Sequence, residues 1–150
     1  QLNTTLKDPK AGEDLTSWMK ARQERFDALP AALAHHEPYA PHFLLHQGRL
    51  RLIDWENINW ANPVSDATVL WLRAAKHPRW QKKLYQQWKR RWSSLGADFD
   101  LAWETDLVVR SAYTLLSAPT YPDKADMRQL AQLSKKIVVA ALKKHRQGRS

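Results

Sequence analysis

Hydrophobic and polar residues follow one another with a helical period over most of this chain. Apolar residues recur every three or four positions in five stretches, each long enough for a helix of ordinary length. Near the N-terminus, for example, Leu15, Trp18 and Leu29 fall close to one face, and Pro30 ends the pattern. We therefore predict helices at about 13–29, 64–76, 79–95, 98–117 and 123–147.

A shorter stretch in the middle of the chain has the pattern of a β-hairpin. Two apolar runs, which begin at Phe43 and Arg49, are separated by the turn signal Gln47-Gly48. We expect a hairpin over residues 43–54 that places Asp54 at the exit of its second strand. Because an isolated hairpin is only marginally stable in water, we expect it to pack on the helices.

Polar composition and proline mark the segments that we expect to be irregular. Residues 1–12 are polar and contain a proline, so we predict an irregular arm there. We expect at most one short turn at 31–34 and loops at 35–41 and 57–63. The expected fold class is therefore mainly α, of the α+β type, with one small β-hairpin packed on about five helices.

Length and composition bound the class of protein. The chain has 150 residues, which is enough for one domain with a hydrophobic core. It contains no cysteine, which excludes a disulfide framework and a thiolate metal site and fits a reducing compartment. There is no apolar run that could span a bilayer and no secretory signal, so we expect a cytoplasmic location. The first residue is Gln1 rather than methionine, which indicates a fragment or a processed product.

The charge of the chain indicates anionic partners. There are 24 Lys and Arg against 15 Asp and Glu, a net charge of +9. The predicted helix at 79–95 is strongly basic and also carries Trp80, Trp88 and Trp92, a mixture that can bind nucleic acid through stacking and phosphate contacts. Because these tryptophans follow helical spacing, we favour buried tryptophans and a solvated basic face, with a nucleic-acid surface as the alternative.

The acids and histidines around the hairpin are the candidates for chemistry. Asp54 ends a predicted strand, where a carboxylate either binds a metal or a phosphate or caps the next turn. Asp54 and Glu56 are also spaced as an acid and a nucleophile on one face of a strand, although nothing else indicates a glycosidase. A less favoured zinc site would draw its ligands from His35, His36, Glu37, His42 and His46.

Two motifs carry a resemblance to a known family. The run Leu52-Ile53-Asp54-Trp55-Glu56, followed by Asn62-Pro63-Val64-Ser65-Asp66 at a helix start, resembles the aminoglycoside phosphotransferase and choline kinase family. The similarity extends over about residues 35–73. It implies that residues 13–150 form the C-terminal lobe of a protein-kinase-like fold, with the N-terminal ATP-binding lobe outside this chain. It also implies that Asp54 holds the magnesium ion of ATP and that Asp66 is a structural anchor for the catalytic loop.

The loop before the hairpin matches the family pattern in part. That pattern is roughly His-x-Asp, four residues, then Asn, in which the Asp is the base and the Asn helps to hold the metal. In one register, His35-His36-Glu37 matches His-x-Asp and His42 falls on the Asn position. In the other register, Pro38 falls on the base and Phe43 on the Asn. Neither register keeps the Asp and Asn pair, so the resemblance implies an impaired loop with Glu37 and His35 as the catalytic candidates.

Three functions follow from these observations. The first is transfer of phosphate from ATP, with Mg²⁺, to the hydroxyl of a small molecule, with impaired activity. The second is a catalytically inactive kinase-like module that binds a partner or an anionic ligand. The third is a basic helical domain that binds nucleic acid.

Overall fold

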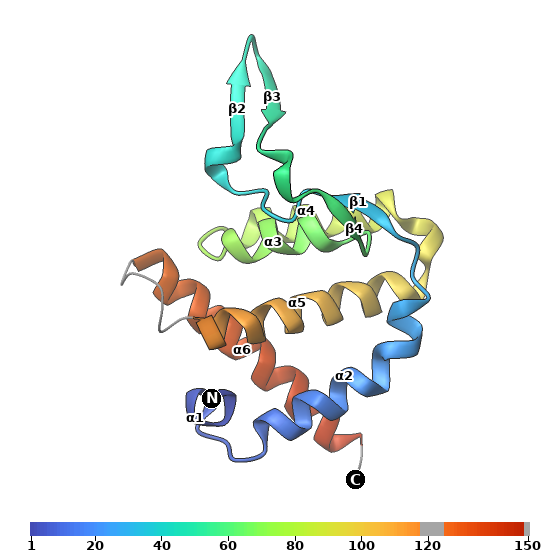
Figure 1. Cartoon of the computed structure of the whole chain (residues 1–150), viewed down its shortest axis with the longest axis vertical. Helices are drawn as coiled ribbons and strands as arrows, with labels where there is room; N and C mark the ends of the chain where they lie inside the picture. The colour runs from blue at the N-terminus through green and yellow to red at the C-terminus, as the bar shows by residue number, and fades with distance from the viewer. Residues whose placement is uncertain (118–124, 149–150) are drawn as a thin grey trace.

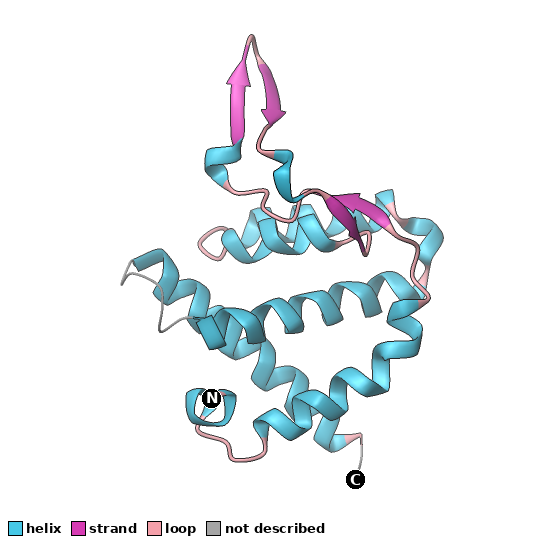
Figure 2. Ribbon diagram, viewed as in Figure 1, coloured by secondary structure: helices cyan, strands magenta, loops and turns pink. Residues whose placement is uncertain are grey.

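The computed structural model describes residues 1–117 and 125–148 of the chain, and these residues are mainly helical, as predicted. Helix makes up 69% of the structure, and the rest includes two small sheets of short strands. Figures 1 and 2 show the helices in the lower and middle parts of the molecule and one hairpin projecting above them. The helices are α1 (Leu2–Leu6), α2 (Ala11–Asp27), α3 (Ser65–Arg73), α4 (Pro78–Arg91), α5 (Ala97–Ser117) and α6 (Ala125–Gln147).

The predicted hairpin is present and consists of β2 (Phe43–His46) and β3 (Arg49–Leu52). The strands are antiparallel, with Phe43 opposite Leu52 and His46 opposite Arg49. Both turn residues have a positive φ, 48° at Gln47 and 71° at Gly48. Two residues with positive φ are typical of the tight turns that match the twist of a hairpin.

The expectation that the hairpin packs on helices is wrong. Leu45 is 76% exposed and Leu50 is 65% exposed. The strands rise away from the helical body, and only their base approaches α3 (Figure 1). Sequence periodicity predicts which residues share a face of a strand, but it does not reveal whether another element covers that face.

A second small sheet replaces two segments that we expected to be irregular. Strand β1 (Ala32–Ala34) pairs antiparallel with β4 (Asn59–Ala61), with Leu33 opposite Trp60. The first strand lies where we expected a short turn, and the second lies in a predicted loop. Strands of three residues are too short to show a period of two, so their pairing depends on tertiary structure.

The predicted irregular arm at residues 1–12 contains the helix α1, which corrects that expectation. Leu2 and Leu6 are buried in a cluster with Leu115 of α5 and Leu142 of α6. A helix of five residues is not stable by itself, so this one depends on its packing. Helix α2 also begins at Ala11, two residues earlier than predicted.

Helix α5 is at the centre of the core. Its buried side chains contact α2, α3 and α6, and Figure 1 shows it between the α3–α4 layer and the lower helices. Phe99 stacks on Trp103, with ring centroids 5.7 Å apart. Trp18 of α2 is fully buried against Val108 of α5. The length of α5 and its mostly apolar sequence explain this position, because a helix that is hydrophobic around most of its circumference is buried.

The tryptophans on α4 and at its C-terminal end divide between the core and the surface. Trp88 and Trp92 are partly buried against the core, and the indole N–H of Trp88 donates to the carbonyl of Pro63 at 2.9 Å. Trp80 is 44% exposed, so the prediction that it is buried is wrong. In the part of the chain that the structure describes, no helix has the length and apolar character needed to cross a membrane.

Candidate functional site

Asp66, in the first turn of α3, joins this helix to the loop that precedes the hairpin. Its Oδ2 accepts the backbone N–H of His35 at 2.8 Å, and its Oδ1 accepts that of His36 at 2.9 Å. A carboxylate that accepts two backbone N–H groups holds a loop firmly, because both oxygens are used and the acceptor is charged. Through these two bonds Asp66 joins the start of α3 to the loop of His35 and His36.

A network that sequence reasoning missed holds the start of α3 itself. Asp106 of α5 is nearly buried and accepts the side-chain amide of Asn62 at 2.8 Å, the Nε of Arg110 at 2.5 Å and the hydroxyl of Thr68. Arg110 also donates to the hydroxyl of Ser65. The sequence did contain a signal for this network, because Asp106 precedes Arg110 by four residues on a mostly apolar helix. The network positions Asp66 through the backbone of α3.

His35 is fully buried and uses both of its ring nitrogens. Its Nε2 lies 2.7 Å from the carbonyl of Ile53, which can only accept, so Nε2 carries the proton. Its Nδ1 then accepts the N–H of Glu37 at 3.3 Å. No nitrogen is left for proton transfer, which corrects the expectation that His35 is catalytic. Its role is to hold the loop against the end of β3.

Asp54 lies two residues after the end of β3, at the exit of the hairpin as predicted, and its side chain faces His42. The Nδ1 of His42 donates to the carbonyl of Glu37 at 2.7 Å, and its Nε2 lies 3.3 Å from Oδ2 of Asp54. Asp54 therefore forms an ion pair when the His42 ring is protonated and faces a nitrogen lone pair when the ring is neutral. The Asp54 carboxyl is 42% exposed.

Glu37 contacts a residue that sequence reasoning did not select. Its Oε2 accepts the side-chain amide of Asn57 at 3.1 Å. Asn57 ends the 3₁₀ turn Trp55–Asn57 just after Asp54. Its polar side chain was the only feature of the sequence that could have marked it as a site residue. The backbone carbonyl of Glu37 thus links the side-chain pair of Glu37 and Asn57 to that of His42 and Asp54.

Backbone strain is concentrated at this site. Four non-glycine residues have a positive φ in the described residues, and two of them are His36, at 69°, and Asp54, at 65°. The other two, Lys7 and Gln47, end a helix and form the hairpin turn. Left-handed backbone outside turns and helix ends is costly and clusters at functional sites.

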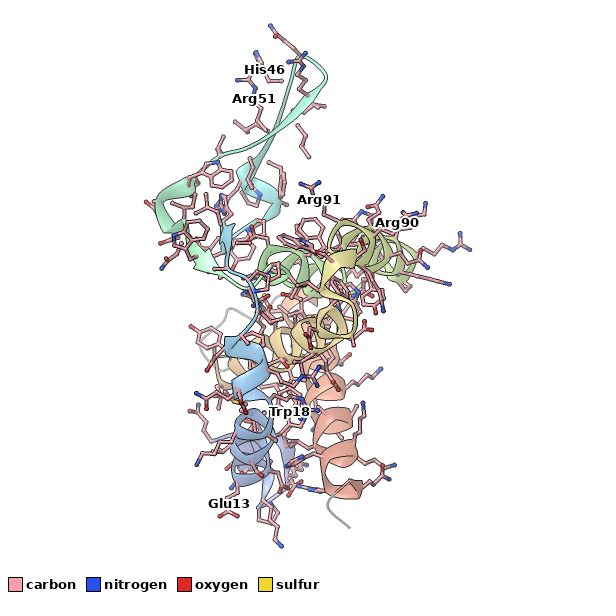
Figure 3. All side chains as sticks on the ribbon, turned by 90° about the vertical axis from the view of Figure 1, so that its right-hand side faces the viewer. Glu13, Trp18, His46, Arg51, Arg90 and Arg91 are labelled. Carbon is pink, nitrogen blue, oxygen red and sulfur yellow. The ribbon has the colours of Figure 1, made fainter. Side chains whose placement is uncertain are left out.

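The histidines and acids near the hairpin do not come together as the ligands of one metal ion within the described residues. Across residues 1–117 and 125–148, no three His, Cys, Asp or Glu side chains are grouped so that they could hold a metal ion. His46 is at the hairpin end, away from the loop of His35, so the zinc set does not assemble (Figure 3). Asp54 offers Mg²⁺ one oxygen ligand, but the neighbouring nitrogen of His42 is a poor ligand for that ion. Asp54 and Glu56 do not share a strand, because both follow the end of β3.

Comparison of the chain with known protein families, with curated proteins and with solved structures finds no match. The interpretation of the site therefore depends on its own geometry.

Proposed function

We propose that this chain is the catalytic-loop half of a small-molecule phosphotransferase-like protein with impaired activity. In this proposal, Asp54 holds the magnesium ion of ATP, Glu37 is the base for an accepting hydroxyl, and Asp66 anchors the loop. The chemistry that ATP and Mg²⁺ supply is a transferable phosphoryl group with its charge neutralised.

The observation that carries the proposal is the double contact of Asp66 with the backbone of His35 and His36. It joins the second motif of the resemblance to the loop, and the bond from His35 to Ile53 joins that loop to the first motif, beside Asp54. This arrangement favours the register in which Glu37 is the base and His42 takes the Asn position. An anchor that holds a loop at this spot is what a positioned base requires.

The exposed hairpin is a second observation in favour of this proposal. Leu45 and Leu50 lie opposite each other across the hairpin and leave apolar area open to solvent on one face, and Leu44 is exposed on the other face. Apolar surfaces of this kind often mark a place where another folded unit packs. A nucleotide-binding lobe on the hairpin would cover these leucines.

The impaired phosphate transfer that we propose follows from two residues, His42 and Glu37. The imidazole of His42 contacts Asp54 where an amide oxygen would assist the metal. Glu37 is one methylene longer than Asp, and a displacement of about 1 Å costs a base on the order of 100-fold in rate. Its carboxylate also accepts a hydrogen bond from Asn57.

Calorimetric titration of the chain with ATP, with and without Mg²⁺, tests the proposal. We expect a Kd no tighter than about 1 mM, or about −4 kcal/mol, because one carboxylate and no second lobe provide few contacts. The variant His42→Asn should bind Mg-ATP more tightly, and Asp54→Ala should abolish the dependence on magnesium. Glu56→Ala, which removes a neighbouring exposed acid, is the control.

Two results would contradict parts of the proposal. Micromolar, magnesium-dependent binding that is lost in Asp54→Ala would show that the site is neither impaired nor incomplete. Binding that is the same with and without magnesium in the wild type and in Asp54→Ala would exclude Asp54 as the metal ligand.

The outer face of α4 favours a second candidate, which is a polyanionic partner such as nucleic acid. The helix has six basic residues and no acidic one, and Figure 3 shows Arg90 and Arg91 extending into solvent. Lys89 pairs with Asp100, whereas the others form no ion pair within the described parts of the chain: Arg79, Lys82, Lys83, Arg90 and Arg91. A row of unpaired cations of this kind attracts phosphates.

A further inference from the structure

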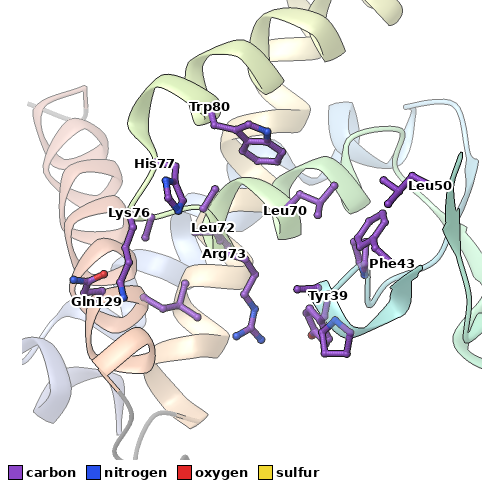
Figure 4. A pocket seen from close by; sticks show the side chains of 16 residues that line it. Tyr39, Phe43, Leu50, Leu70, Leu72, Arg73, Lys76, His77, Trp80 and Gln129 are labelled. Atoms are coloured by element: carbon purple, nitrogen blue, oxygen red, sulfur yellow. The ribbon is translucent and has the colours of Figure 1, made fainter. Parts of the chain in front are cut away.

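A cavity of about 1120 Å³ lies between the base of the hairpin, the end of α3, the start of α4 and the side of α6. Figure 4 shows the side chains of these elements around one opening. The volume lies slightly above the usual range for sites that bind small molecules, about 300–1000 Å³. The lining residues that matter here are Tyr39, Phe43, Leu50, Leu70, Arg73 and Trp80.

The walls of the cavity are mostly apolar and partly open. Trp80 is 44% exposed and Leu50 of β3 is 65% exposed, so both have apolar area that a ligand can cover. Phe43 and Tyr39 add two more aromatic rings from the opposite side of the opening. An apolar ligand that covers these exposed aromatic side chains binds favourably, because it removes their apolar area from water.

The polar groups of the cavity have one sign of charge. The guanidinium of Arg73 lies 4.6 Å from the ring centroid of Tyr39, and its other contact is the sulfur of Met127. No carboxylate pairs with Arg73 among residues 1–117 and 125–148. Among the described residues, the cavity lining includes Lys76 and His77 and contains neither Asp nor Glu. A planar guanidinium without an acidic partner is suited to bidentate contact with a carboxylate.

We propose that this cavity binds an amphipathic carboxylate. The apolar body of the ligand lies against Tyr39, Phe43 and Trp80, and its carboxylate pairs with Arg73. A polycationic ligand does not fit, because no acid of the described residues lines the cavity to meet it. The proposal does not depend on phosphotransfer, since it involves neither Asp54 nor a nucleotide.

Displacement of the fluorescent probe 8-anilinonaphthalene-1-sulfonate tests the proposal on the whole chain. The competitors are decanoate, decanol and decyltrimethylammonium, which share one alkyl chain and differ in charge. We expect decanoate to displace the probe at a concentration about tenfold lower than the other two, because a charge-assisted pair adds about this much. Arg73→Gln should remove this preference and keep displacement by decanol. Trp80→Ala should weaken displacement by all three compounds.

Lys82→Gln, on the outer face of α4, is the matched control and should bind decanoate like the wild type. Melting curves from circular dichroism identify any variant that fails to fold, and Arg73→Lys then provides a variant that keeps the charge. Equal displacement by the three competitors, or an unchanged preference in Arg73→Gln, would overturn the proposal. So would a dimer that disappears in Trp80→Ala, because the cavity would then be an interface between two copies of the chain.

Discussion

Single polar residues far apart in the sequence hold the loop around His35. Asp66 accepts its two backbone N–H groups, and His35 reaches the end of β3 through its ring. Neither residue has a position where it would transfer a proton, yet both decide where Glu37 lies. The base of the proposed reaction therefore depends on residues that never touch a substrate.

We predict that Asp66→Ala lowers the free energy of unfolding by about 1–3 kcal/mol, because two partly buried N–H groups lose their acceptor. Asp66→Asn should fall between the wild type and the alanine variant, since an amide offers one acceptor oxygen instead of two. Urea-induced unfolding measures both changes. An unchanged midpoint in Asp66→Ala would show that the anchor contributes nothing to stability.

At the scale of elements, the hairpin differs from every helix in having no packed face. Helices α2, α3, α5 and α6 each place side chains in a shared core, whereas β2 and β3 leave theirs largely in solvent. The stability of the molecule should therefore be almost independent of the apolar residues near the hairpin turn.

We predict that Leu45→Thr and Leu50→Thr each change the free energy of unfolding by less than about 0.5 kcal/mol. Leu72→Ala, at a buried position of α3, is the comparison and should cost about 2–5 kcal/mol. Chemical denaturation followed by circular dichroism gives all three values. If the hairpin variants lose as much free energy of unfolding as Leu72→Ala, the hairpin packs on the helical body in solution.

Over the whole molecule, ion pairs join segments that are distant in the sequence. Arg146 near the end of α6 contacts Asp8 at 2.6 Å and Asp14 at 2.5 Å, which ties the two ends of the described chain together. The hydrogen bond from Arg146 lowers the pKa of Asp8, with help from the backbone N–H of Lys10. In the same way, Lys89 and then Tyr85 lower the pKa of Asp100.

These lowered pKa values predict how stability depends on pH. A lowered pKa means that the folded state binds the proton of Asp8 or Asp100 less tightly than the unfolded state does. The contribution of each pair is therefore complete above the unfolded pKa, near about 4, and is lost as the pH falls through the lowered value. Arg146→Gln and Lys89→Gln should each make the stability less dependent on pH below about 5.

Urea unfolding at several pH values between about 2 and 7 measures this effect. Lys83→Gln, which removes an exposed cation of α4, is the control and should leave the slope unchanged. If the free energy of unfolding changes with pH in both test variants as it does in the wild type, other carboxylates cause the acid sensitivity.

Local sequence by itself determined the long helices, the hairpin and its turn. Their signals are repeated over many residues or carried by a specific turn pair, so they survive in any tertiary setting. Asp54 at the hairpin exit and Asp66 at the start of α3 could be placed for the same reason, because both stand at the boundary of a strong element. The chemistry of Asp54, in contrast, depends on His42, which only the fold brings to 3.3 Å.

Only the tertiary structure decided the helix α1, the sheet of β1 and β4, the exposure of the hairpin and the part played by His35. Short elements have too few residues for a period, and they form because distant partners bury or pair them. The sequence around His35 does not reveal whether its ring is free or held by hydrogen bonds. In this protein the N–H of Glu37, two residues along the chain, occupies one ring nitrogen, and the carbonyl of Ile53, which only the fold brings close, occupies the other.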